Sequence, residues 1–351
     1  MKTSTSMPFG PRPVRCATGP AGTGPTGPGD TDPGDTDPGD TVPLGPSDSN
    51  PAPVGASASA PAKGAAPLGT DRSSTRRTRR DSEVRLLAVT GRLTERDRLI
   101  CRLLDEHRVL TTAQIADVGF TGERRARMRL AELYALDLID RFRPRTWGNP
   151  APFHWTLGPL GVALVAAEVG LEPSALSWRR TLAHELAHSQ RLAHLVGTNG
   201  FFCALMRSAR TRPGCSLEEW WSERRCAREW GEVVRPDGYG IWTEADTSLP
   251  ILLEYDNGTE TLSRLAGKLD GYRRLAHAAG HPNWVLFSFS TPRREHDAAR
   301  VLAGHGVPVA TATRSARITP DTAIWAPLAP SVPGGGRLRL AALAQLPLEA
   351  A

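Results

Sequence analysis

The stretch HELAHSQRLAH, residues 184–194, contains residue types that can bind a metal ion. His184 and His188 are four positions apart, so a helix would present both imidazoles on one face. Glu185 between them could polarise a zinc-bound water for hydrolysis of a peptide bond. Such a site needs a third ligand, and His194 is the candidate that this stretch offers.

The spacing of His194 argues against a zinc site. The sequence predicts one continuous helix over about 180–196, on which His194 would lie roughly 15 Å along the axis from His184. Zinc–nitrogen bonds are about 2 Å long, so these histidines could not share one ion. A zinc protease is therefore disfavoured, and we expect the histidines on the polar or packing face of a helix between two domains.

A second group of candidate residues follows Pro236. Asp237 comes directly after this proline, and Glu254 and Asp256 end the apolar run LPILLEYD. The pattern resembles the PD-(D/E)XK nuclease-like superfamily, in which an Asp at a strand turn and a Glu on the next strand bind Mg²⁺ together. The resemblance implies a Mg²⁺-dependent endonuclease or nickase with Asp237 and Glu254 as its metal ligands.

The chain departs from that superfamily at one position. Asp256 stands where a lysine would stabilise the attacking water, and a carboxylate supplies no positive charge. Lys268 is the only lysine after residue 63, and it lies on the predicted helix after the Glu254 strand, where it could take over that role. The candidate catalytic residues are Asp237, Glu254, Asp256 and Lys268, and an inactive nuclease-like domain is the competing interpretation.

The segment before these residues predicts a winged helix-turn-helix. LTERDRLICRLLDEHRVL has Thr94 three residues before Asp97, a pattern typical of a helix start, followed by apolar residues at helical spacing. TTAQIADVGF and GERRARMRLAELYALDLI predict two more helices, and LIDRFRPRTWGNPAPFHWTLGPLG predicts a hairpin before a closing helix. Three helices and a hairpin are the plan of a winged helix.

Arginines concentrate on the third of these helices and on the hairpin. The planar arginine donors match guanine edges and phosphates, so the pattern predicts binding to double-stranded DNA. A solvated helix face or a protein-interaction adaptor are the alternatives. The candidate DNA-binding residues are Arg124, Arg125, Arg127, Arg129, Arg141 and Arg143, with Arg145 further along the hairpin.

The second half of the chain predicts a mixed sheet flanked by helices. Helices are expected at about 180–196, through FFCALMRSAR, at about 260–279 and at PRREHDAARVLAGHG, with strands on both sides of Pro236 and at LPILLEYD, NWVLFSFS, VPVATATR and TAIWAPL. The predicted fold class is α/β (α+β). Its parts are a disordered tail (1–90), a winged-helix domain (91–172), a nuclease-like domain (178–330) and a C-terminal tail (331–351).

Composition limits the partners and the compartment. Residues 1–90 are rich in Pro, Gly and Asp, and their few large apolar residues predict disorder up to a basic cluster at Arg72, Arg76, Arg77, Arg79 and Arg80. The net charge of +6 permits a nucleic-acid partner, and the five Cys include no C-x-x-C pair. Without a signal peptide or an apolar run of roughly 20 residues, we expect a cytoplasmic protein with no membrane partner.

Taken together, the motifs resemble the replication-relaxation family of plasmids and integrative elements. The resemblance covers roughly residues 90–330 and rests on LTERDRLICRLLDEHRVLTTAQIADVGF, the Arg-rich helix and hairpin, RPDGYG, LLEYDNGTE and KLDGYRRL. It implies a DNA-binding accessory protein in replication, relaxation or transfer, with plasmid replication or transfer proteins as candidate partners. It implies no cofactor except Mg²⁺, and that only if the nuclease-like site is active.

Overall fold

The computed structural model describes residues 72–144, 151–280, 283–316, 318–328 and 336–347, with side chains from residue 81 onward. The repeats of the predicted tail, the side chains of its basic cluster and Arg145 therefore lie outside the described residues. The elements described from residue 77 onward belong to one compact unit. Residues 72–90, for which a disordered tail was predicted, form helix α1 (Arg72–Thr90).

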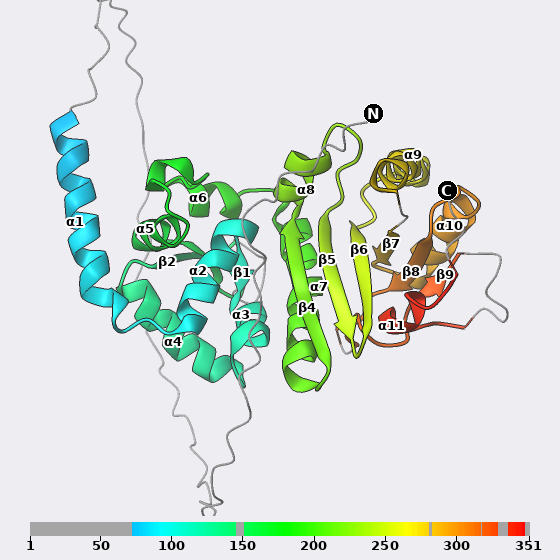
Figure 1. The fold of residues 1–351 in the computed structure, drawn as a ribbon, viewed down its shortest axis with the longest axis horizontal. Helices are drawn as coiled ribbons and strands as arrows, with labels where there is room; N and C mark the ends of the chain where they lie inside the picture. The colour runs from blue at the N-terminus through cyan, green and yellow to red at the C-terminus, as the bar shows by residue number, and fades with distance from the viewer. Residues whose placement is uncertain (1–71, 145–150, 281–282, 317, 329–335, 348–351) are drawn as a thin grey trace, which may run out of the picture. The chain divides into compact units, whose positions relative to one another are not determined.

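Helices and a small sheet form the part of the chain for which a winged helix was predicted (Figure 1). The sheet is antiparallel, in the order β1-β3-β2. Capping boxes begin α2 at Thr94 and α3 at Thr111, where each hydroxyl accepts a hydrogen bond from the backbone N–H three residues later. The elements are α2 (Glu95–His107), β1 (Leu110–Thr111), α3 (Thr112–Gly119), α4 (Glu123–Ala135), β2 (Ile139–Phe142), β3 (His154–Leu157) and α5 (Pro159–Glu168).

A larger mixed sheet follows, in the order β4-β5-β6-β7-β8-β9. The first three strands are antiparallel, β6 to β8 are parallel, and β9 is antiparallel to β8. The predicted α/β (α+β) fold class is therefore confirmed. The strands are β4 (Cys215–Ser222), β5 (Gly238–Glu244), β6 (Thr247–Asp256), β7 (Trp284–Phe289), β8 (Val309–Thr313) and β9 (Ala326–Pro327), and the crossover helices are α9 (Leu262–Ala279) and α10 (Pro292–Leu302).

Different helices bury the two faces of this sheet. Along β6, Ile251 and Leu253 pack in the same cluster as the residues of α7 (Leu192–Thr211), whereas Leu252 between them packs with Leu265 and Leu269 of α9. This alternation is the period of two expected for a strand with both faces covered.

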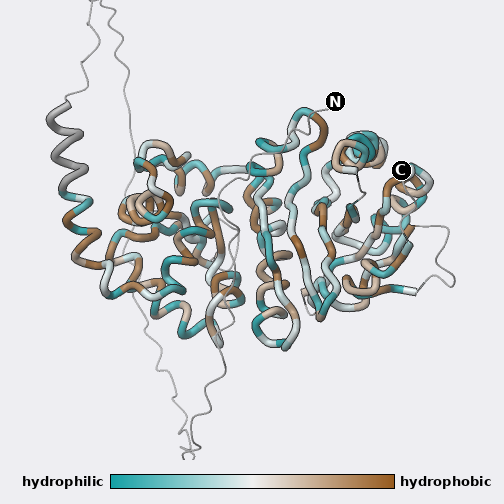
Figure 2. The backbone as a smooth tube through the Cα atoms, viewed as in Figure 1, coloured by the Kyte–Doolittle hydropathy of each residue, from teal (hydrophilic) through white to brown (hydrophobic). Residues whose placement is uncertain are grey.

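The helices differ in their hydropathy. Figure 2 shows that α5 is mostly hydrophobic and α4 largely hydrophilic. No helix in the described part of the chain is long and apolar enough to cross a membrane.

The prediction of one continuous helix over about 180–196 is wrong. Helix α6 (Leu182–Ala187) ends before the turn at residues 188–191, and α7 then runs without a break through the segment predicted as a separate helix. The Ser189 hydroxyl accepts a hydrogen bond from the backbone N–H of Arg191 at 3.2 Å, a local bond that competes with the helical ladder. His194 consequently lies in the first turn of a new helix.

Two other segments differ from the prediction. The strand that precedes Pro236 is β4, and the run directly before Pro236 contains helix α8 (Glu223–Trp230) followed by turns. An irregularity in the pairing between Leu217 and Glu219 disturbs the alternation by which β4 could have been found. Part of the predicted C-terminal tail belongs to the core, because Leu340 and Leu343 of α11 (Leu340–Leu343) are fully buried.

Side chains of α7 hold the α2–α5 segment against the larger sheet. The buried Asn199 amide donates to the backbone carbonyls of His107 and Val109, at 3.2 and 2.8 Å. The Gln114 amide donates in the other direction, to the carbonyl of Val196 at 2.6 Å. These bonds satisfy buried polar groups that would otherwise lose their partners on leaving water.

Replacing Asn199 by Ala should destabilise the protein. The variant leaves the carbonyls of His107 and Val109 without this donor, at a cost of about 1–3 kcal/mol in the free energy of unfolding measured with urea. Arg207→Ala is the matched control on the same helix, since its half-exposed pair with Asp117 should be worth at most about 1 kcal/mol. Equal losses in the two variants would contradict this role of Asn199.

Candidate functional site

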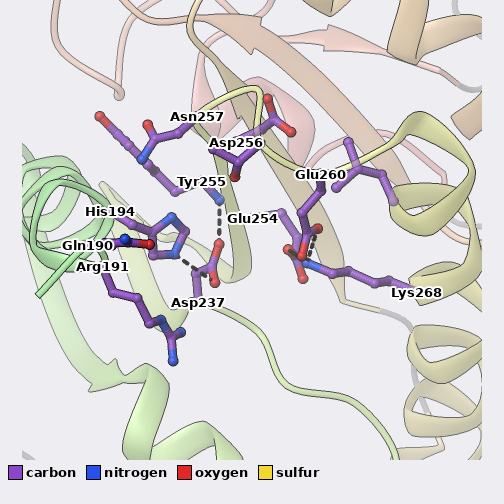
Figure 3. A pocket seen from close by; sticks show the side chains of 12 residues that line it. Gln190, Arg191, His194, Asp237, Glu254, Tyr255, Asp256, Asn257, Glu260 and Lys268 are labelled. Atoms are coloured by element: carbon purple, nitrogen blue, oxygen red, sulfur yellow. Dashed lines mark hydrogen bonds and ion pairs between the residues drawn. The ribbon is translucent and has the colours of Figure 1, made fainter.

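A polar pocket of about 220 Å³ lies where β5 begins and β6 ends (Figure 3). The backbone N–H of Asp237 donates to the carbonyl of Leu253 at 3.0 Å, which places Asp237 beside Glu254 on the neighbouring strand. The sequence pattern predicts this relation between an Asp at a strand turn and a Glu on the next strand. The lining includes all four candidate catalytic residues: Asp237, Glu254, Asp256 and Lys268.

Asp237 is held by donors from two elements. The Nε2 atom of His194, from the first turn of α7, lies 3.0 Å from one carboxylate oxygen of Asp237. The backbone N–H of Tyr255 donates to the other oxygen at 2.7 Å. The hydrogen bond to Asp237 raises the pKa of His194 above its usual value, although partial burial opposes the shift. Figure 3 shows the imidazole and the carboxylate turned toward one another.

Glu254 is the most deeply buried of the candidate residues, with 1% of its surface exposed. Burial raises the pKa of its carboxyl to about 7, and the charge of Asp237 adds to this shift. Two donors from α9 oppose it: the Lys268 ammonium, 2.7 Å from one oxygen, and the Tyr272 hydroxyl, which donates to the other. Lys268 also lies 3.1 Å from a carboxylate oxygen of Glu260.

Asp256 lines the same pocket, but its carboxylate has other partners. The Arg294 guanidinium donates to both Asp256 oxygens, at 3.1 and 2.9 Å, and the backbone N–H of Gly258 donates to one of them at 2.8 Å. This two-pronged pairing of Arg with a carboxylate is a strong and directional interaction. Asp256 therefore joins the end of β6 to the start of α10.

The carboxylates of the pocket do not fit a Mg²⁺ site as they are placed. Both oxygens of Asp237 and both oxygens of Glu254 already accept hydrogen bonds from protein donors. Mg²⁺ requires oxygen ligands in a near-octahedral arrangement, which donors at these positions would obstruct. In the described ranges, no group of three or more His, Cys, Asp or Glu is arranged to hold a metal ion.

The histidines of the HELAHSQRLAH stretch (184–194) lie in two different places. The rings of His184 and His188 are 4.5 Å apart, and both side chains are exposed. Glu185 accepts a hydrogen bond from the Thr181 hydroxyl at 2.7 Å, and this bond holds the pKa of its carboxyl below the usual value. His194 instead faces Asp237 in the pocket.

The candidate DNA-binding arginines fall into three groups. Three of them are exposed on α4, whereas Arg129 is bound to Asp97 of α2 through two hydrogen bonds of 2.9 and 2.6 Å. The exposed Arg141 and Arg143 on and beside β2 stack on Phe153, with 4.3 and 3.8 Å from guanidinium carbon to ring centre. The three exposed on α4 are Arg124, Arg125 and Arg127.

Sequence reasoning missed two residues that shape the pocket. Tyr272 is four residues after Lys268, so helical spacing alone places both on the face of α9 that meets Glu254. That signal was present in KLDGYRRL. His194 gave no such signal, because its position depends on the break between α6 and α7, which the helical pattern conceals.

The pairing of His194 with Asp237 should make stability depend on pH. Because the pKa of His194 is raised, the protonated imidazole stabilises the fold below its ordinary pKa of 6.5, and this contribution is lost as the pH rises through the raised value. We expect the free energy of unfolding to fall more steeply between about pH 6 and pH 8 in the wild-type protein than in His194→Gln. Urea unfolding at several pH values measures this.

A substitution of Asp237, the residue paired with His194, is the control for this pH effect. Asp237→Asn removes the charge that raises the pKa of His194 and should flatten the pH dependence to a similar degree. A slope unchanged from wild type in both variants would show that the pair does not contribute to stability.

The comparison with known proteins adds one finding. The family model described as replication-relaxation matches residues 101–284. This range contains α4, Asp237, Glu254 and Lys268. No curated protein and no solved structure matches the chain significantly. Because the matched range covers more than half of the 351 residues, the protein belongs to the replication-relaxation family.

Proposed function

We propose that the protein is a DNA-binding accessory factor in the replication, relaxation or transfer of a plasmid or mobile element. Its membership of the replication-relaxation family connects it with the replication or relaxation of such DNA. The observation that carries the proposal is the exposed arginine face of α4, with Arg124, Arg125 and Arg127 within its first five residues. In this proposal residues 91–172 act as a winged-helix domain, and α4 enters or flanks the major groove.

The packing of α4 supports this role. Its buried residues, Ala126, Leu130 and Leu133, recur at helical spacing on one side, so its arginines point away from the core. The neighbouring α3 packs against α7, and in this arrangement the arginine face of α4 is left exposed to solvent. Double-stranded DNA is the proposed partner because arginine binds both phosphates and guanine edges.

Arg129 has a different part in this proposal. Its two bonds to the buried Asp97 fix α4 against α2, so we assign it to the positioning of the helix rather than to DNA. Arg141 and Arg143 are suited to contact the DNA backbone beside the groove. Their stacking on Phe153 limits their rotamers, so less side-chain entropy is lost when they bind a phosphate.

The larger domain, about residues 178–330, is proposed to be nuclease-like without a cleaving role. The carboxylate oxygens of Asp237 and Glu254 already have protein partners, which favours a silent site. One observation favours the alternative of a Mg²⁺-dependent endonuclease, namely that Lys268 lies 2.7 Å from Glu254 in the pocket of Asp237. A protein-interaction adaptor is the remaining alternative, with replication or transfer proteins as partners.

Removing the arginines of α4 should weaken DNA binding. The triple variant of Arg124, Arg125 and Arg127 to Ala should lower the affinity for duplex DNA at least roughly tenfold and reduce the salt dependence of binding by up to about three counterions, measured by fluorescence anisotropy at several salt concentrations. A triple variant of exposed arginines on α9 and α10 loses the same charge and should bind nearly as wild type. Its changes are Arg273, Arg293 and Arg300 to Ala.

An equal loss of affinity in both triple variants would mean that binding follows net charge alone and would contradict the role of α4. Folding of each variant is checked by thermal unfolding, because the changed side chains are exposed and should leave the core intact. Absence of any DNA binding by the wild-type protein would favour the adaptor.

Incubation with supercoiled plasmid should leave the DNA uncut. We expect no nicking by the wild-type protein with Mg²⁺, with Mn²⁺ or with EDTA, because the pocket carboxylates are already bound by protein donors. Asp237→Ala and Glu254→Ala serve as controls for contaminating nucleases. Metal-dependent nicking that disappears in both variants would overturn the silent site and establish the endonuclease.

A further inference from the structure

A lysine ammonium lies among the carboxylates of the pocket. The Nζ atom of Lys268 is 2.7 Å from Glu254 and 3.1 Å from Glu260, and Asp237 lines the same pocket. We propose that Lys268 replaces a divalent cation, so that the protein carries a latent metal site which its own lysine fills. This inference deepens the proposed function, and rests on it, because it names what keeps the nuclease-like site silent.

Lys268 is surrounded by carboxylates whose negative charge it compensates. Glu254 is 1% exposed, so an ionised carboxylate there needs a positive partner inside the protein. Asp237 adds to the unfavourable negative potential at Glu254, and the nearby Glu260 carries a further carboxylate. Lys268 is the cation in direct contact with both Glu254 and Glu260 (Figure 3). In the described structure it performs the electrostatic task of a bound metal.

The other cations near the pocket have different partners, except the exposed Arg264, whose Nε atom lies 3.6 Å from one oxygen of Glu260. Arg294 is committed to Asp256, and Arg191 forms an ion pair with Glu223 at 2.6 Å. His194 is paired with Asp237. Loss of Lys268 would therefore leave Glu254 with the Tyr272 hydroxyl as its donor and no cation in contact, and Glu260 with the longer Arg264 contact, next to the volume that the lysine side chain had filled. Carboxylate oxygens around such a space are ligands that hard divalent cations bind.

The test is to remove the lysine from the full-length protein and measure Mn²⁺ binding. Wild-type protein should show no Mn²⁺ binding at this pocket, whereas Lys268→Ala should bind Mn²⁺ with an affinity at least about tenfold above the detection limit. Binding is detected by electron paramagnetic resonance of free Mn²⁺. The same metal should raise the unfolding temperature of Lys268→Ala more than that of wild type, because it binds only the folded state.

Double variants show which residues bind the Mn²⁺ ion in Lys268→Ala. Adding Glu254→Gln or Asp237→Asn to Lys268→Ala should abolish the gain, whereas adding Glu229→Gln, at an exposed carboxylate on α8, should not. Lys268→Arg keeps the positive charge and should gain no Mn²⁺ affinity. If Lys268→Ala does not fold, Lys268→Gln preserves more of the side-chain volume and takes its place.

Two outcomes would overturn the inference. One is a folded Lys268→Ala or Lys268→Gln variant that gains no Mn²⁺ binding. The other is a wild-type protein that binds Mn²⁺ and loses it in Asp237→Asn, since the lysine would then coexist with a metal rather than replace it. Neither result bears on the arginines of α4, so the anisotropy measurements test the DNA-binding part of the proposed function separately.

Discussion

Helix α7 packs against the larger sheet on one side and against the α2–α5 segment on the other, and the rest of the structure depends on these two contacts. A Cβ atom at Gly197 would lie 2.3 Å from the Tyr255 ring, so only glycine allows this close approach to β6. Two residues later, Asn199 binds the carbonyls of His107 and Val109. One turn of helix therefore fixes both contacts, and the same helix start aims His194 at Asp237.

The parts of the fold that could be predicted are those in which local pattern and tertiary environment agree. The apolar run of β6, the helical spacing of α9 and the capping box at Thr94 each reflect one short-range rule, and each element lies where it was expected. The break between α6 and α7 was missed because the sequence is compatible with a continuous helix. The helix is interrupted where the Ser189 hydroxyl accepts a hydrogen bond from the backbone of Arg191, and helix propensities do not include such a bond. Strand β4 was missed because its pairing irregularity and half-exposed residues hide the alternation.

The candidate site shows a similar division. Asp237 and Glu254 could be placed side by side from sequence, because a turn and the next strand determine their relation. The donors on their oxygens could not, since Lys268 and Tyr272 reach Glu254 only when α9 crosses β6 in one particular register. Whether a pair of carboxylates is accessible to a metal ion thus depends on tertiary packing. The sequence motif predicts that the two carboxylates are neighbours, but it does not predict which donors already bind them.

The choice of lysine at residue 268 has a physical reason in a chain that uses arginine almost everywhere else. A guanidinium is a planar fork, suited to both oxygens of a single carboxylate, as Arg294 binds Asp256. An ammonium is a compact charge whose donors can point toward separate carboxylates, as Lys268 does with Glu254 and Glu260. A metal ion is likewise a compact positive charge that several carboxylates can contact at once. Arginine also bridges two carboxylates in this structure, as Arg212 does with Glu244 and Asp321. What sets Lys268 apart is the small size of its charged group, and this is the property that lets it take the place of a metal cation.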